Sequence, residues 1–108
     1  MNRVKVANTS ELGPGEMMGL DIKGNQLLLV NLDGKFYATD GRCTHMMGKL
    51  WEGSLRGKIV KCPRHGTEFD VTTGKVMKKP WLPLAKAKDL AIYGTTVEGD
   101  EVFLEMED

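Results

Sequence analysis

Two short segments of this chain contain all of its cysteines and histidines. The first is Cys43-Thr44-His45 and the second is Cys62-Pro63-Arg64-His65. Because the sequence has two cysteines and two histidines in total, every residue of either type falls into one of these segments. Thiolates and imidazoles are the ligands that select zinc, copper and iron–sulfur clusters. The sequence therefore offers four candidate metal ligands, Cys43, His45, Cys62 and His65.

Two other uses of these residues remain open from their types alone. A disulfide between the two cysteines is one, but it leaves both histidines without a role, whereas metal ligation uses all four residues. A structural zinc site is the other. Zinc fingers usually take their cysteines as one pair and their histidines as another, with about three to five residues between the histidines on a helix. Here each segment mixes one Cys with one His, and no helical pattern follows.

The pattern Cys-x-His…Cys-x-x-His, ending at His65-Gly66, resembles that of the Rieske-type ferredoxins, and the resemblance covers most of the chain. In that family two histidines replace two cysteines on one iron of a [2Fe–2S] cluster. Each loop must then send one ligand to each iron, and the alternating order of Cys and His meets that demand. The resemblance implies one cluster per chain, bound by Cys43, His45, Cys62 and His65. A ferredoxin with four cysteine ligands is excluded, since the chain has two cysteines.

The rest of the sequence indicates an all-β fold. No segment sustains an apolar period of about 3.6 residues, and thirteen glycines punctuate short runs. Gly24-Asn25, Asp33-Gly34 and Gly99-Asp100 are expected hairpin turns, and one helical turn fits within residues 9–15. The expected strands are Val4–Ala7, Met17–Ile22, Gln26–Leu32, Lys35–Thr39, Lys58–Lys61, Thr67–Val71, Leu90–Tyr93 and Glu101–Met106.

Two loops, residues 41–53 and 62–66, interrupt these strands and carry the candidate ligands. A third, extended loop is expected at residues 78–83, because Pro80 and Pro83 disfavour regular structure. This loop resembles the proline-containing loop that covers the cluster in Rieske proteins. Trp81 of this chain would then either cap the cluster or belong to the core. Trp51 is expected to pack locally. We therefore predict one domain over residues 1–108, an antiparallel β-sandwich or barrel whose cluster-binding part, formed by two ligand loops, spans about residues 41–83.

Composition and charge narrow the class of protein. Apolar residues make up 41% of 108 residues, which fits one globular domain. No apolar run approaches the ~18–20 residues that cross a bilayer, and the N-terminus lacks a signal core, so a cytoplasmic protein is expected. Residues 42–88 carry eleven basic and three acidic groups, a formal charge of +8, whereas residues 89–108 carry seven acidic groups and no basic ones. Such a charge dipole argues against nucleic acid as the partner.

Departures from the family's subtypes indicate the soluble, low-potential branch. High-potential respiratory Rieske proteins carry two further cysteines that bridge the cluster loops, and the matching positions here are Gly48 and Arg64. Those proteins also use a Ser and a Tyr as hydrogen-bond donors to the cluster. Thr67 keeps the first hydroxyl, whereas Phe69 lacks the second. We expect a midpoint potential toward the negative end of the Rieske range, near ~−150 mV.

The resemblance implies a one-electron carrier that takes electrons from a flavin-dependent reductase and gives them to a terminal oxygenase or another redox enzyme. No catalytic base, nucleophile or phosphate loop is apparent, so we expect a monomeric electron-transfer protein and not an enzyme. The alternatives are a non-catalytic Rieske subunit or redox sensor of a larger complex, and a zinc-stabilised interaction module.

Overall fold

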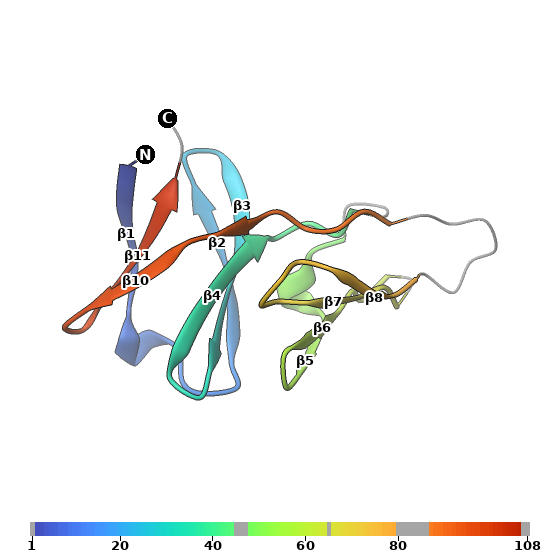
Figure 1. Cartoon of the computed structure of the whole chain (residues 1–108), viewed down its shortest axis with the longest axis horizontal. Helices are drawn as coiled ribbons and strands as arrows, with labels where there is room; N and C mark the ends of the chain where they lie inside the picture. The colour runs from blue at the N-terminus through green and yellow to red at the C-terminus, as the bar shows by residue number, and fades with distance from the viewer. Residues whose placement is uncertain (1, 45–47, 65, 80–86, 107–108) are drawn as a thin grey trace.

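The chain is represented by a computed structural model that describes residues 2–44, 48–64, 66–79 and 87–106. The strands of these residues form three antiparallel sheets, which follow one another along the longest axis of the molecule (Figure 1). The first sheet has the order β1-β11-β10, with β1 at Asn2–Asn8, β10 at Thr95–Glu98 and β11 at Glu101–Met106. The expected turn at Gly99-Asp100 joins β10 to β11.

The second sheet has the order β2-β3-β4-β9. Its strands are β2 (Met17–Ile22), β3 (Asn25–Leu32), β4 (Lys35–Asp40) and β9 (Ile92–Tyr93). The turn at Asp33-Gly34 is confirmed, with both residues at positive φ (53° and 92°), as tight hairpins favour. The turn expected at Gly24-Asn25 is instead Lys23-Gly24, also at positive φ, because Asn25 already pairs with Ile22.

Strand β3 separates two hydrophobic cores, and this explains its unbroken apolar run. Because side chains alternate along a strand, Leu27 and Leu29 enter a core shared with Leu104 and the rest of the first sheet. Leu28 and Val30 face the opposite way, into a core that also contains both cysteines. The β-sandwich prediction is thus confirmed for the first two sheets, which we call the base.

The third sheet has the order β5-β6-β7-β8 and lies beyond the second core (Figure 1). Its strands are β5 (Ser54–Arg56), β6 (Ile59–Lys61), β7 (Glu68–Asp70) and β8 (Val76–Lys78). Two 3₁₀ turns complete the described elements: η1 (Thr9–Glu11), within the expected helical turn, and η2 (Leu50–Glu52), inside the first ligand loop. We call this sheet together with residues 41–53 the cluster-binding part.

All eight expected strands are present, but three short ones were not predicted. Strands β5, β8 and β10 have three or four residues each, too few to show an alternating pattern. Some predicted ends were also wrong. Lys58 lies in the turn between β5 and β6, and Leu90 precedes β9 instead of belonging to it. Among the described residues, no helix has the length and apolar character that crossing a membrane requires.

Candidate metal centre

The two candidate cysteine ligands lie in the same core, at the ends of strands from different sheets. Cys43 follows β4 and Cys62 follows β6, and their exposed fractions are 0% and 2%. They are not joined in a disulfide. His45 and His65 lie outside the described residues, as do Trp81 and the prolines of the third loop. Both cysteines therefore occupy a buried position suited to a thiolate bound to metal.

The backbone of the first ligand loop is held at both ends. The amide of Gly41 donates to the carbonyl of Gln26 on β3 at 2.9 Å, and the amide of Leu50 donates to the carbonyl of Gly41 at 2.9 Å. Within the loop, the amide of Cys43 donates to the carbonyl of Gly48 at 2.7 Å. These bonds place Cys43 and Gly48 side by side and fix them against the base.

Trp51 packs inside the molecule and joins this loop to the base. A Cβ atom at Gly19 would lie 2.5 Å from the indole, and one at Gly41 would lie 2.8 Å from it, so the ring occupies space that only glycines leave free. The guanidinium of Arg42 lies over the same ring, 5.9 Å from its centroid, and its Nε donates to Gln26 Oε1. Arg42 therefore packs against the ring instead of projecting toward solvent as part of the basic surface.

A hairpin hydrogen bond closes the second ligand loop. The amide of Cys62 donates to the carbonyl of Thr67 at 2.8 Å, across the ends of β6 and β7. Gly66 has a φ of +75°, a conformation that glycine adopts without strain. Cys62 is thus fixed by the third sheet, just as Cys43 is fixed by the second.

The two loops approach each other closely at Gly48. A Cβ atom at this position would lie 2.8 Å from Cys62 Sγ and 3.1 Å from Cγ of Arg64. Any larger side chain here would displace the Cys62 sulfur. The positions that carry bridging cysteines in the high-potential branch are therefore adjacent in this chain, but Gly48 and Arg64 cannot form the bridge.

A buried hydroxyl beside Cys62 indicates that a bound group belongs here. Thr67 is fully buried, and its Oγ1 is the one buried side-chain polar atom of the described residues without a hydrogen-bond partner. A buried polar group without a hydrogen-bond partner destabilises the folded protein by about 1–3 kcal/mol. A sulfide or thiolate of a cluster between the loops would accept this hydrogen bond. Two buried cysteines, a glycine against a cysteine sulfur and an unpaired hydroxyl fit a [2Fe–2S] cluster. The cysteines alone do not complete a site, and no group of three or more His, Cys, Asp or Glu forms among the described residues.

The surface around the two loops is basic. Five cations in or next to the segments that carry the ligand loops are exposed: Lys49, Lys61, Arg64, Lys78 and Lys79. The predicted concentration of positive charge in the middle of the chain is therefore a surface property of the cluster-binding part. It lies where a partner would approach the ligand loops.

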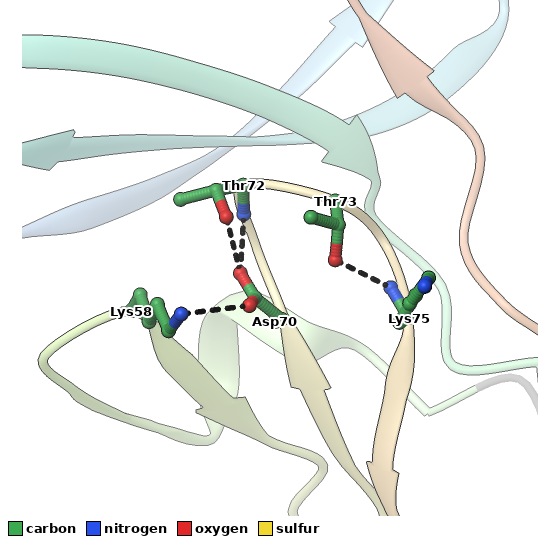
Figure 2. Close-up of polar contacts among 5 residues, drawn as sticks. All are labelled: Lys58, Asp70, Thr72, Thr73 and Lys75. Carbon is green, nitrogen blue, oxygen red and sulfur yellow. Dashed lines mark hydrogen bonds and ion pairs between the residues drawn. The ribbon is translucent and has the colours of Figure 1, made fainter.

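Asp70 organises the turn between β7 and β8 (Figure 2). Its Oδ1 accepts hydrogen bonds from the amide and the hydroxyl of Thr72, at 2.8 and 2.6 Å, and its Oδ2 lies 3.2 Å from Lys58 Nζ. Burial opposes ionisation of this carboxyl, but the bonds from Thr72 and Lys58 outweigh it and lower the pKa of Asp70. An ionised aspartate thus holds the turn at the end of β7 that lies away from the second ligand loop.

Sequence reasoning missed the residues that hold the ligand loops from a distance. Thr44, between two candidate ligands, makes its hydrogen bonds to Lys88, 44 positions along the chain. Trp51 depends on Gly19, which belongs to β2. No local pattern reveals such contacts, because they depend on how the sheets pack.

Comparisons with known proteins agree with this geometry. The sequence profile of the Rieske [2Fe-2S] domain matches residues 2–93. The chain is 33% identical over 106 residues to the ferredoxin component of the naphthalene 1,2-dioxygenase/salicylate 5-hydroxylase systems of Ralstonia sp., covering 98% of this chain and 97% of that one. It is 32% identical over 107 residues to the ferredoxin component of biphenyl 2,3-dioxygenase from Rhodococcus jostii, covering 99% and 95%.

Solved structures show the same likeness in three dimensions. The ferredoxin of carbazole 1,9a-dioxygenase from Nocardioides aromaticivorans superposes with a TM-score of 0.87 at 27% identity, over 99% of this chain and 100% of that one. A chain in the complex of reduced oxygenase and oxidized ferredoxin of carbazole 1,9a-dioxygenase gives a TM-score of 0.85 at 30% identity, over 94% and 100%.

Proposed function

This chain belongs to the Rieske [2Fe–2S] family and is an electron-carrying ferredoxin, not itself a catalyst, and we propose that it delivers electrons to a terminal oxygenase. A flavin-dependent reductase is the proposed donor. The relatives named above are ferredoxin components of dioxygenase systems, and one solved relative is in complex with its oxygenase.

The observation that carries the proposal is the pair of buried cysteines beside the unpaired hydroxyl of Thr67. We propose that Cys43 and Cys62 bind one iron and that His45 and His65 bind the other, as in the rest of the family. A bound [2Fe–2S] cluster supplies reversible one-electron oxidation and reduction. The protein holds the two cysteine side chains away from water and leaves no room for a side chain at Gly48. Its buried Thr67 hydroxyl, unpaired in the protein alone, would be available to donate to a bound cluster.

The basic surface supports an acidic docking site on the partner. Lys78 and Lys79 are exposed at the end of β8, and Arg64 is exposed in the second ligand loop. Opposite charges on two proteins raise the rate of encounter more than they raise affinity. We propose that the protein docks as a monomer through this face, because a carrier that exchanges partners needs fast association and fast release.

Two further properties belong to the same proposal. Residues 1–108 are proposed to form one domain with its cluster-binding part at about residues 41–83, since β3 contributes side chains to both cores. A single cooperative unfolding transition would support this. A cytoplasmic location is proposed because both cysteines are used without a disulfide. Cell fractionation with antibody detection tests it.

Metal analysis and kinetics test the function in two steps. Anaerobically purified protein should contain about two irons and two acid-labile sulfides per chain, with a Rieske-type EPR spectrum after reduction. Mixed with a reductase and a Rieske oxygenase of the naphthalene or biphenyl type, it should be reduced and reoxidised repeatedly during substrate turnover. Stoichiometric zinc without iron would overturn the ligand assignment. A loaded protein that no oxygenase reoxidises would overturn the choice of partner.

A further inference from the structure

Residues 88–91, which we call the strap, connect parts of the molecule that lie far apart in the sequence. They run from the cluster-binding part back to the base, where the chain enters β9 (Figure 1). The strap is not part of a sheet, yet each of its residues bonds to another segment. This arrangement raises the question of what the strap holds together.

At its first residue the strap is fastened to the first ligand loop. The amide of Lys88 donates to Thr44 Oγ1 at 2.9 Å, and the same hydroxyl donates to the carbonyl of Lys88 at 2.6 Å. A threonine hydroxyl has one proton to donate and lone pairs to accept, so this single side chain satisfies both polar groups of one backbone residue. Thr44 lies between the proposed ligands Cys43 and His45.

At its next two residues the strap is fastened to the third sheet. Asp89 Oδ1 accepts from the amide of Val76 on β8 at 2.9 Å, and the amide of Leu90 donates to the carbonyl of Gly74 at 2.7 Å. Gly74 belongs to the turn that Asp70 organises, and its own amide donates to the carbonyl of Asp70 at 2.7 Å. The Leu90 side chain is buried in the core that contains both cysteines.

The last strap residue is fastened to the base. Asp40 exchanges two hydrogen bonds with Ala91: its amide donates to the Ala91 carbonyl at 3.0 Å, and its Oδ2 accepts from the Ala91 amide at 3.1 Å. Asp40 ends β4, just before the first ligand loop. The strap therefore links the first ligand loop, the sheet that carries the second loop, and the strand from which the first loop departs.

We propose that Thr44 is a positioning residue that fastens the first ligand loop to the strap, and that the strap keeps the two ligand loops at a fixed separation. The two loops lack a covalent link, because Gly48 and Arg64 occupy the positions where a disulfide would form. The strap provides a non-covalent link in its place. The proposal rests on the ligand assignment above and is independent of which enzyme accepts the electron.

The test measures how fast the loaded protein loses its iron to an excess of chelator. In Thr44→Val the side chain keeps its shape but loses both hydrogen bonds to Lys88. We expect iron release roughly five- to thirtyfold faster than in the unmodified protein, as the loss of about one or two net hydrogen bonds implies. The EPR spectrum of the reduced cluster should also change, because the ligands on either side of Thr44 are held less firmly. Thr44→Ser should restore most of the slow release.

Thr73→Val is the matched control. The Thr73 hydroxyl also accepts a backbone amide, that of Lys75 at 3.2 Å, but within one turn of the third sheet (Figure 2). The Thr73→Val variant should release iron at the rate of the unmodified protein, and its EPR spectrum should be unchanged. Asp89→Ala tests the attachment of the strap to the third sheet and should speed release by up to about fivefold, whereas Asp89→Asn, which keeps an acceptor oxygen, should not.

The outcomes separate clearly. Iron release from Thr44→Val at the unmodified rate would overturn the proposal, and so would release from Thr44→Ser as fast as from Thr44→Val. If Thr44→Val does not fold with its cluster, Asp89→Ala decides, and an unchanged rate there would equally overturn it. Unmodified protein that contains no iron would instead refute the ligand assignment.

Discussion

The base and the cluster-binding part differ in how their charged side chains are arranged. In the base, two ion pairs link the first strand to β10 and β11: Arg3 with Glu98 at 2.7 Å and Lys5 with Glu101 at 3.0 Å. In the described portion of the cluster-binding part, Lys58 pairs with Asp70 at 3.2 Å, within the third sheet. Part of the acidic charge near the C-terminus is therefore compensated locally by the first strand.

The two parts also differ in how they are held together. Five of the seven strands of the base have six to eight residues, and the base has its own core, to which neither cysteine belongs. The cluster-binding part has strands of three residues, and its core includes Cys43 and Cys62. We infer that the base folds stably through its own core, whereas the stability of the cluster-binding part depends on the bound cluster.

The largest expected effect comes from removing a ligand. Cys43→Ser, Cys62→Ser, His45→Ala and His65→Ala should each abolish or severely reduce iron binding, because no other side chain takes the missing place. If the base is independent of the cluster, amide protons of β1 and β11 should stay protected from hydrogen exchange in these variants. Iron analysis and exchange measured by NMR check both statements. Loss of protection throughout the chain would contradict the division into two parts.

The next effect concerns the unpaired hydroxyl of Thr67. Removing it should stabilise the metal-free protein but make the loaded cluster harder to reduce. In the metal-free protein Thr67→Val should raise the free energy of unfolding by about 1 kcal/mol, because an unsatisfied buried group disappears. In the loaded protein it should lower the midpoint potential by roughly 40 mV, since a donor that favours the more negative, reduced cluster is lost. Chemical unfolding measures the free energy of unfolding, and protein-film voltammetry measures the midpoint potential.

Thr39→Val is the control for that experiment. Thr39 is as buried as Thr67, but its hydroxyl donates to the carbonyl of Asp40 at 2.9 Å. The same substitution should therefore destabilise the metal-free protein and leave the midpoint potential unchanged. If both valine variants destabilise the metal-free protein equally, the Thr67 hydroxyl has a partner without the cluster.

The third effect concerns the exposed cations. Lys78→Glu combined with Lys79→Glu should slow electron transfer to the oxygenase roughly tenfold at low ionic strength, and salt should reduce the difference. Lys23→Glu combined with Lys35→Glu makes the same change in net charge on the base, in the turn between β2 and β3 and at the start of β4. Stopped-flow rates that fall equally in both variants would show that net charge, not the basic surface, sets the rate.

The smallest expected effect is the pH dependence contributed by Asp70. Its pKa is lower in the folded protein than in the unfolded chain, so its stabilisation is present above the unfolded pKa of about 3.9. It is lost as the pH falls through the folded pKa. Asp70→Asn should reduce the free energy of unfolding by up to about 1 kcal/mol at neutral pH, with a smaller difference below about pH 4. Urea unfolding at several pH values measures it, and a constant difference would contradict the assignment.

The sequence predicted those features that depend on neighbouring residues. The cysteine and histidine spacing indicated the cluster, and Asp33-Gly34 indicated its hairpin, because both signals lie within a few residues. Strand β5 could not be predicted, because Ser54–Arg56 owes its extended form to pairing with β6. The strap was missed for the same reason, since Thr44 has no sequence feature that indicates Lys88. The pairing of strands in the first sheet likewise brings Glu98 and Glu101 next to Arg3 and Lys5, and the sequence alone did not indicate these ion pairs.

The pairing of β1 with β11 has a practical consequence for fusing this protein to another protein or attaching it to a surface. Asn2 pairs with Met106, so both ends of the described chain lie at the same pole of the molecule, opposite the β5–β8 sheet (Figure 1). A linker joined at either end leaves the ligand loops facing outward. The fold is therefore suited to fusion with a reductase or to oriented immobilisation on an electrode through its termini.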